Sequence, residues 1–226
     1  MKLFFFSVKE NYDQSVADSN ITDFWTNQIC RRIAAVIVVI INPTPITPNM
    51  ITCFSFLFNL VANYQLILGE LGFAAVLFFI SFIMDCADGQ LARHRSIVSK
   101  LGIYIDIVLD SFKDIITFIA LIVYFAQGSL FYYSLFSMFI ISSSILIDWV
   151  RKTMLNVVKE AKPVKSGTLS KYGIVFWSGP IRNLLIVFCL ILYVPEGIIY
   201  YSCLFGAYCT YKKGLDLIRQ LQIIGG

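Results

Sequence analysis

The sequence predicts an all-α, polytopic membrane protein with about six transmembrane helices. An interfacial amphipathic helix is expected to precede them, and both termini are expected to be cytoplasmic. Hydrophobic residues make up 58% of the 226 residues and charged residues only 14%, against about a quarter charged in an ordinary soluble domain. The eighteen lysines and arginines are also confined to a few segments between long apolar stretches. Both observations are typical of helices that cross a bilayer.

Residues 1–46 are expected to form a cytoplasmic N-terminal segment that ends in the interfacial helix. Residues 1 to about 20 are polar, and they predict irregular structure. A helix start is expected at Ile21-Thr22-Asp23, and an apolar stretch follows from Ile33 to Ile41. Nine apolar residues are too few to span a bilayer core, which takes roughly 20. We therefore expect this helix to lie along the membrane surface.

The flanks of that apolar stretch support the interfacial position. Trp25, Arg31 and Arg32 precede it, and these residue types prefer the level of the lipid headgroups. Asn42-Pro43 ends it, because proline cannot continue a helix. The alternative is an additional crossing helix, which would invert the topology. The distribution of basic residues argues against that alternative.

Residues 47–226 are expected to form a six-helix membrane domain. The first helix is predicted to begin near Thr47-Pro48, because proline early in a helix with threonine nearby is ordinary helix-start chemistry. With their less apolar ends included, most of the apolar stretches approach the length of a bilayer crossing. These stretches are Ile51–Leu68, Leu71–Met84, Ile115–Ala126, Leu130–Ile147, Leu184–Val194 and Ile198–Tyr211.

The connections between these stretches predict the topology. Three short turns, at 68–71, 126–129 and 194–197, contain no lysine or arginine. Basic residues gather instead at the N-terminus, around 93–113, within 151–182 and after 211. Because basic residues stay on the cytoplasmic side, we expect these four regions to be cytoplasmic. The membrane is expected to be the plasma (inner) membrane. The net charge of +4 thus indicates topology and contact with membrane lipid, and gives no argument for nucleic acid.

Four carboxylates stand out in this apolar chain. Asp85 and Asp88 lie three residues apart, Asp106 and Asp110 lie four apart, and each pair therefore shares one helical face. An ionised carboxylate at membrane depth costs a few kcal/mol, so it persists only where something compensates it. Hard oxygen ligands suit Mg²⁺ or Mn²⁺, and four are enough to hold two ions. The pattern predicts a metal-dependent active site, with a diphosphate as the natural substrate.

Small residues and one cation are interleaved with the carboxylates. Gly89, Ala92 and Gly102 leave room for close helix packing and for a nucleotide, and Arg93 can bind a phosphate. Two other protein classes are alternatives to an enzyme. A proton- or cation-coupled transporter could use the same carboxylates, but it predicts charged groups in the outer half of the bundle as well. A purely structural membrane subunit would leave the carboxylates without compensation.

The string resembles the signature of the CDP-alcohol phosphotransferases, D-x2-D-G-x2-A-R-x8-G-x3-D-x3-D. All eight fixed positions are met, by Asp85, Asp88, Gly89, Ala92, Arg93, Gly102, Asp106 and Asp110. Within the family, residues 21–52 are most similar to the di-myo-inositol-phosphate phosphate synthase branch. The resemblance implies transfer of a substituted phosphate from a CDP-linked donor to an alcohol, with release of CMP.

The resemblance also implies roles for individual residues. Asp85, Asp88 and Asp106 would be the principal metal ligands; Asp110 would complete the metal site and act as the general base, so that Asp106 and Asp110 are the catalytic pair. The CDP-binding pocket would be lined by Asn49, Thr52, Asp88, Gly89, Ala92, Arg93 and Gly102.

The substrates beyond the nucleotide are less constrained. The donor is expected to be CDP-diacylglycerol or a CDP-polyol, and the acceptor an alcohol that can itself be phosphorylated. Cations near the site would suit such an acceptor; the candidates are Arg151, Lys152, Lys171 and Arg182. The same residues are also consistent with a plain basic loop that touches lipid headgroups. Family members are commonly homodimers, and a homodimer is expected here.

Overall fold

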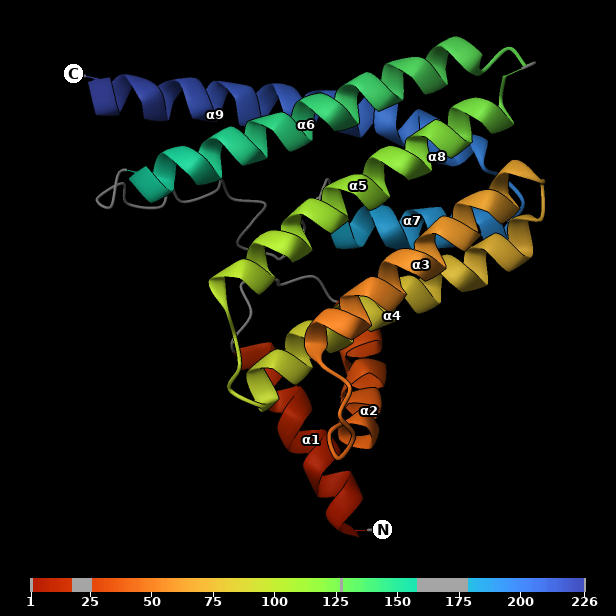
Figure 1. Ribbon diagram of the computed structural model, residues 1–226. Coiled ribbons are helices and arrows are strands. Elements are labelled where there is room, and N and C mark those ends of the chain that lie inside the picture. The colour runs from red at the N-terminus through yellow and green to blue at the C-terminus, as the bar shows by residue number, and fades with distance from the viewer. Residues whose placement is uncertain (1, 18–25, 127, 158–178, 226) are drawn as a thin grey trace.

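The computed structural model describes residues 2–17, 26–126, 128–157 and 179–225. Within these ranges the chain is helical wherever it is regular, and no strand is present (Figure 1). The prediction of an all-α protein is confirmed. The helices, including two short π-helical segments η1 and η3, are α1 (Lys2–Ala17), η1 (Thr26–Cys30), α2 (Arg31–Ile41), α3 (Pro48–Ile67), α4 (Leu71–His94), α5 (Lys100–Tyr124), α6 (Phe131–Val157), α7 (Gly179–Ile191), α8 (Glu196–Tyr201), η3 (Ser202–Gly206) and α9 (Ala207–Gly225).

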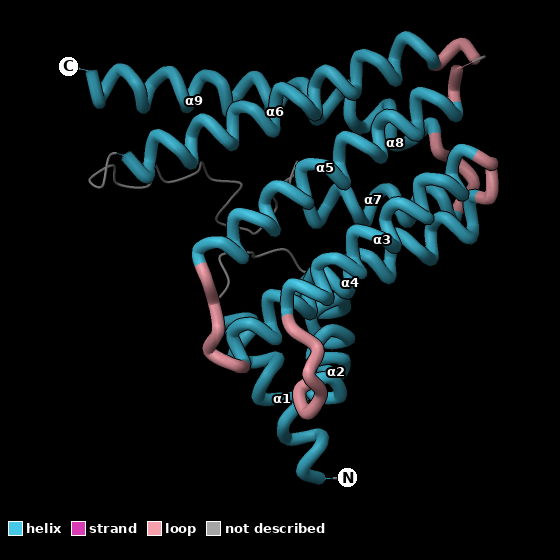
Figure 2. The backbone as a smooth tube through the Cα atoms, viewed as in Figure 1, coloured by secondary structure: helices cyan, strands magenta, loops and turns pink. Residues whose placement is uncertain are grey.

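The long helices form a layered bundle, and the N-terminal pair lies at one end of it. Helix α3 packs along α4 and also contacts α5, α5 contacts α6, and α6 lies beside α9 (Figure 1). Helix α7 packs on α4, and α1 and α2 pack together beneath the end of α4. The turns after α3, α5 and α7 lie at the same end of the bundle, away from the connection between α4 and α5 (Figure 2). This is the arrangement that the predicted short turns require.

Two helix starts fix the segments that later form the site. The Thr47 side chain accepts a hydrogen bond from the Met50 amide at 3.4 Å, and Pro48 occupies the first helical position of α3. Ser99 caps α5 in the same way, because its Oγ accepts the Gly102 amide at 2.9 Å. Such caps satisfy backbone donors that a helix start leaves free. The predicted start of the first long helix at Thr47-Pro48 is confirmed.

Small and polar side chains hold α3 against α4. Ser55 Oγ donates to the Ser81 carbonyl at 2.9 Å, and Ser81 Oγ donates back to the Ser55 carbonyl at 2.8 Å. Ala62, Ala74 and Ala75 are fully buried at the same contact. Small residues let two helix backbones approach closely, and reciprocal hydrogen bonds suit an apolar interior. This pairing brings the start of α3 next to the last turns of α4.

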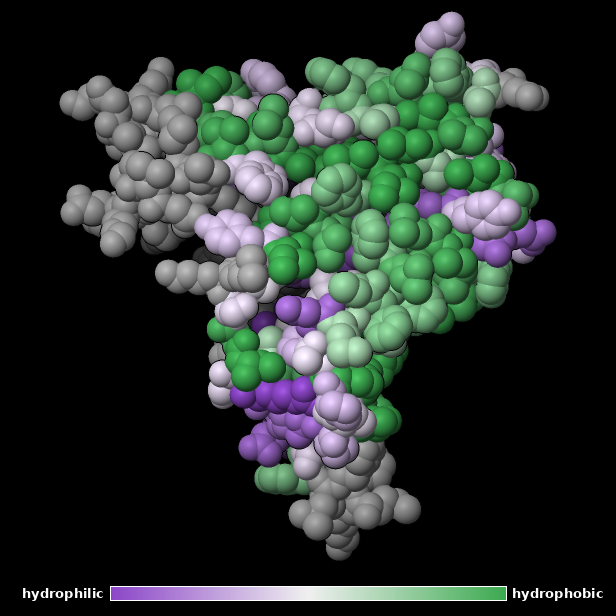
Figure 3. Space-filling view, viewed as in Figure 1, coloured by the Kyte–Doolittle hydropathy of each residue, from purple (hydrophilic) through white to green (hydrophobic). Residues whose placement is uncertain are grey.

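Among the described residues, three helices are long and apolar enough to cross a membrane: α3, α4 and the first twenty residues of α6. Helix α5 is also long, but Asp106, Asp110, Lys113 and Asp114 interrupt its apolar residues. The six predicted apolar stretches all fall on helices, the last one on α8, η3 and α9 together. Six crossings and the side of each terminus stay predictions. Apolar side chains cover much of the face shown in Figure 3, and hydrophilic ones gather near the connection between α4 and α5.

Two expectations for the N-terminal segment are wrong. Residues 2–17 form helix α1, where the polar composition predicted irregular structure. Helix α1 is held by tertiary contact with α2, for example by Arg32 over the Tyr12 ring at 5.3 Å, and local composition does not show such contact. Arg31 was expected among headgroups, yet it is only 6% exposed. The predicted helix start at 21–23 lies outside the described residues.

Candidate active site

The first of two adjoining cavities lies where α3 begins, against the last turns of α4 and the connection to α5. Its volume is about 590 Å³. The seven residues expected to bind the CDP group all line it, together with Asp106 and the connection residues Ile97, Val98 and Ser99. We call it the nucleotide cavity. Its lining residues are Thr47, Pro48, Asn49, Thr52, Asp88, Gly89, Ala92, Arg93, Ile97, Val98, Ser99, Gly102 and Asp106.

The second cavity lies between α4, α5 and α7 and reaches η1 and the start of α2. Its volume is about 390 Å³. We call it the central cavity. It shares Asp88, Gly89, Arg93 and Asp106 with the nucleotide cavity, so the two cavities meet at the carboxylates. Its charged lining residues are Arg31, Asp85, Asp88, Arg93, Asp106, Asp110, Lys113, Asp114 and Arg182.

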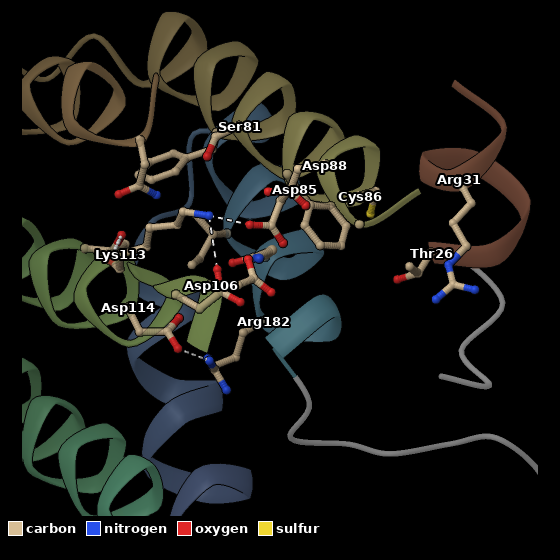
Figure 4. Close-up of a pocket in the computed structure, with 18 of the residues that line it drawn as sticks. Thr26, Arg31, Ser81, Asp85, Cys86, Asp88, Asp106, Lys113, Asp114 and Arg182 are labelled. Carbon is tan, nitrogen blue, oxygen red and sulfur yellow. Dashed lines mark hydrogen bonds and ion pairs between the residues drawn. The ribbon is translucent and has the colours of Figure 1, made fainter. Parts of the chain in front are cut away.

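Three of the four predicted carboxylates converge. Asp85, Asp88 and Asp106 each offer one oxygen, and these oxygens lie within 4.8 Å of one another. Asp85 and Asp88 come from α4 and Asp106 from α5, so the cluster joins the two helices across the central cavity (Figure 4). A set of carboxylate oxygens at this separation fits a hard divalent cation, which takes oxygen ligands. The residues present therefore suit Mg²⁺ or Mn²⁺.

Asp88 is the most enclosed of these carboxylates. It is 5% exposed, and its Oδ2 accepts a hydrogen bond from Thr52 Oγ1 at 2.5 Å. Thr52 is itself 6% exposed and stands one turn after the cap of α3. A buried carboxylate needs hydrogen-bond donors or cations around it. The contact orients Asp88 and ties α3 to the carboxylate cluster.

Asp110 lies in the central cavity but belongs to a different contact. Its Oδ1 accepts a hydrogen bond from Lys113 Nζ at 3.0 Å, and the same ammonium group pairs with Asp85 (Figure 4). The Lys113 side chain is 11% exposed, whereas that of Asp110 is 48% exposed. Lys113 therefore joins α4 and α5 beside the three clustered carboxylates. Metal binding by Asp110 stays a prediction.

Lys113 and Asp114 are neighbours in the sequence, and the structure shows separate partners for the two. Lys113 contacts Asp85 and Asp110, and Asp114 pairs with Arg182 from α7. Lys113 is one turn after Asp110, so the three-residue spacing was a usable signal for that contact. The pair between Asp114 and Arg182 joins residues 68 positions apart, and no local spacing could indicate it.

The Arg93 guanidinium lies next to Gly89 on α4. A Cβ at residue 89 would stand 3.4 Å from Nη1 and 3.7 Å from Nη2 of Arg93, which is van der Waals contact. Arg93 Nε is buried, and among the described residues it has no hydrogen-bond partner. A buried guanidinium donor without a partner is costly unless a ligand meets it. Arg93 borders both cavities, and an anionic group at their junction would satisfy it.

Of the four residues expected at the acceptor, Arg182 lines the central cavity. Arg151 and Lys152 lie on α6, where only the backbone is described, and Lys171 lies outside the described residues. Arg31 lines the central cavity as well, near Thr26 and on the far side of the carboxylates from Lys113 in Figure 4. The sequence analysis did not connect Arg31 with the site, because its approach depends on how α2 packs on α4.

Comparison with known proteins agrees with this geometry. The sequence model of the CDP-alcohol phosphatidyltransferase family matches residues 45–210, which include both cavities' helices α3, α4, α5 and α7. Since the match covers most of the 226 residues, the chain belongs to this family, as its signature predicted. It is a membrane protein of that family.

Shorter stretches resemble individual proteins. The chain is 38% identical over 79 residues to a bifunctional IPC transferase and DIPP synthase from Thermococcus kodakarensis, which covers 35% of this chain and 18% of the relative. It is 36% identical over 69 residues to an archaetidylinositol phosphate synthase from Pyrococcus horikoshii, covering 30% and 37%. A bifunctional IPC transferase and DIPP synthase from Archaeoglobus fulgidus is 37% identical over 98 residues, covering 42% and 18%. The chain thus spans less than half the length of these relatives.

Proposed function

We propose that this member of the CDP-alcohol phosphatidyltransferase family transfers a substituted phosphate from a CDP-linked donor to an alcohol and releases CMP. The observation that carries the proposal is the junction of the two cavities. One cavity has the small residues and the arginine expected for a nucleotide, the other has several cations, and the carboxylates stand between them. A group transferred between two substrates must be reached from both sides, and this arrangement allows it.

The nucleotide cavity would orient the donor. Arg93 would supply its buried Nε donor to the diphosphate, and Gly89 and Gly102 line the cavity without a side chain. Asp85, Asp88 and Asp106 would hold divalent cations, as their oxygen spacing supports. Cations bound there would neutralise the charge that develops on the leaving CMP. Thr52 keeps Asp88 in place through its 2.5 Å hydrogen bond.

The acceptor hydroxyl would enter from the central cavity, with Asp110 as general base. The acceptor oxygen forms a bond to the phosphorus of the substituted phosphate, and the bond from that phosphorus to the CMP oxygen breaks. The hydroxyl proton passes to Asp110, whose partly exposed side chain can return it to solvent. Lys113 holds Asp110 through the 3.0 Å contact, so the carboxylate has a fixed orientation.

The acceptor proposed here is a phosphorylated alcohol such as an inositol or glycerol phosphate. Arg31 and Arg182 line the central cavity in addition to the residues already assigned to the donor. Guanidinium groups bind phosphate through paired hydrogen bonds. The name of one matched relative, an archaetidylinositol phosphate synthase, agrees with this choice.

A coupled transporter is not favoured. The clustered carboxylates are confined to the last turns of α4 and the first turns of α5, whereas a transport pathway needs groups that reach both faces of the bundle. The same end of the bundle carries the basic connection between these helices, so we place the site at the cytoplasmic face.

The proposal is tested with the purified chain in lipid nanodiscs. CMP release is measured with CDP-diacylglycerol or a CDP-polyol, with inositol phosphate or glycerol phosphate as acceptor, and with Mg²⁺ or with EDTA. We expect CMP and the new phosphodiester in equal amounts with one donor, and no turnover in EDTA. Folded protein that releases no CMP from either donor with any acceptor would contradict the proposal.

A further inference from the structure

Arg95 lies directly after α4 and contacts the loop that joins α2 to α3. Its guanidinium group donates hydrogen bonds to five acceptors within residues 41–46. They are Asn42 Oδ1 at 3.3 Å and the carbonyl oxygens of Ile46 at 2.6 Å, Asn42 at 2.8 Å, Thr44 at 3.0 Å and Ile41 at 3.3 Å. A guanidinium has five N–H donors in a rigid fork, so its donors are concentrated on this one loop.

The acceptors explain why an arginine suits this position. The carbonyls at the end of α2 and in the following loop have no partner within a helix, and a cation near a helix C-terminus is favourable. Among the described residues, no carboxylate lies within ion-pair distance of Arg95. Its charge therefore acts on backbone carbonyls. The loop is held by this side chain together with its own turn, in which the Thr44 amide and hydroxyl donate to the Ile41 carbonyl at 2.8 and 2.6 Å.

The fixed loop leads straight into one wall of the nucleotide cavity. The residue after Ile46 is Thr47, which lines that cavity together with Asn49 and Thr52. On the other side of Arg95 the chain turns at Ser96, which has a φ of 56°, and continues into Ile97, Val98 and Ser99 of the same cavity. Arg95 thus joins two of the three segments that surround the nucleotide cavity, at the point where both segments begin.

We propose that Arg95 is a positioning residue for donor binding: it sets the start of α3 against the connection between α4 and α5. The inference builds on the proposed function, since it assigns a determinant of that same nucleotide cavity. Arg95 does not line either cavity, so its effect passes through the loop. Thr47 to Thr52 would move relative to Arg93 and Gly102 without it, and the donor would lose contacts.

The central cavity should be much less affected. Helix α2 has other attachments to α4, because Gln90 Nε2 donates to the Arg31 carbonyl at 3.1 Å and Ala34 and Val38 pack on Ala87 and Leu91. These contacts hold Arg31 independently of the loop. Loss of Arg95 is therefore expected to affect the two substrates differently. The affinity for the donor falls, and the affinity for the acceptor does not change.

The test compares wild type, Arg95→Gln and Arg95→Lys in the full chain in nanodiscs. CMP binding is measured by calorimetry with Mg²⁺, and KM is measured for donor and acceptor. We expect the CMP Kd and the donor KM to rise about tenfold in Arg95→Gln, which corresponds to about 1.4 kcal/mol, with kcat and the acceptor KM within about twofold. Arg95→Lys should be intermediate, since an ammonium has three donors in place of five.

Arg32→Gln is the matched control. It removes a cation from α2, the helix that precedes the loop bound by Arg95, and Arg32 lines neither cavity. It should leave CMP binding unchanged. If Arg95→Gln lowers only thermal stability, lowers only kcat, or raises both KM values equally, the inference is wrong. Where Arg95→Gln does not fold, Arg95→Lys decides by the same criteria. Wild-type chain that binds no CMP would overturn the proposed function and this inference together, whereas equal binding by wild type and variants would overturn the inference alone.

Discussion

The nucleotide cavity and the central cavity share four residues but are assembled differently. Three segments, residues 47–52, 88–93 and 97–106, supply the lining of the nucleotide cavity, so all of it comes from two successive long helices and the start of the third. The central cavity draws on residues from Thr26 to Ile186, including η1, α2, α3, α4, α5 and α7. A cavity formed by neighbouring segments can be recognised from motif spacing. A cavity formed by distant helices depends on packing that spacing does not reveal.

The largest effect is expected where the cavities meet. Asp88→Asn removes a carboxylate that lines both, so we expect kcat to fall about 10²- to 10³-fold with either acceptor and either donor. The measurement is CMP release at saturating substrates. Asp13→Asn, at an exposed residue of α1, is the control and should retain full turnover. If Asp88→Asn keeps more than half the wild-type kcat, Asp88 does not have the role in turnover that we assign to it.

The same contrast explains what the sequence could and could not predict. All four carboxylates were predicted to come together, because helical periodicity places residues three or four apart on one face and the short connection brings the end of α4 near the start of α5. Asp85, Asp88 and Asp106 do converge. The resemblance to the family assigned Asn49 and Thr52 to the nucleotide, and both line the nucleotide cavity at the start of α3. The convergence of the carboxylates needs only local geometry and one tight connection.

Most site residues that were not predicted depend on long-range packing. Arg31 reaches the central cavity because α2 packs on α4. Asp114 meets Arg182 because α7 packs on α4 and faces α5 across the central cavity. Helix α1 likewise forms against α2, although its own composition predicted no helix. Lys113 is the exception. Its position one turn after Asp110 was visible in the sequence, and only its bridge to Asp85 required the fold.

A second variant tests the central cavity by itself. Removing Arg182 alone would take a partner from the buried Asp114 carboxylate and so destabilise the fold. The informative protein is therefore Asp114→Asn with Arg182→Gln. We expect the KM for inositol phosphate to rise about 10- to 100-fold, from loss of a charge-assisted hydrogen bond, and the donor KM to stay within about twofold.

The specificity of that loss is the control. An unphosphorylated alcohol cannot use the guanidinium in the same way, so its turnover should change far less than that of inositol phosphate. The Asp114→Asn single variant measures any effect of the carboxylate alone. An equal loss for phosphorylated and unphosphorylated acceptors would mean that Arg182 supports the fold and takes no part in acceptor recognition.

A third variant tests the nucleotide cavity with a smaller expected effect. Thr52→Val keeps the shape of the side chain and removes the 2.5 Å hydrogen bond to Asp88. We expect the donor KM to rise about three- to tenfold, since an intramolecular hydrogen bond makes a net contribution of about 0.5–1.5 kcal/mol. Cys53→Ala, at the exposed neighbouring residue, should change nothing. A rise in the acceptor KM as large as that in the donor KM would show that Thr52 serves both cavities.

The smallest effect concerns the turn that closes the nucleotide cavity. Ser96 has a φ of 56°, which favours glycine, and Gly69 has a φ of 84° in the turn after α3 at the other end of the bundle. A left-handed backbone conformation at a residue with a Cβ destabilises the folded state by about 1–2 kcal/mol. Glycine avoids this cost, but its greater freedom in the unfolded chain lowers the free energy of unfolding by about 0.5–1 kcal/mol. Ser96→Gly should therefore raise the free energy of unfolding by less than about 1 kcal/mol. Gly69→Ala should lower the free energy of unfolding by a similar amount, because a Cβ there meets no atom within 4 Å and only the backbone conformation opposes it.

Thermal unfolding in detergent measures the stability of both variants, and the donor KM of Ser96→Gly should match that of the wild type. A large rise in that KM would show that the Ser96 side chain itself contributes to the nucleotide cavity, whose wall would then depend on more than its backbone turn.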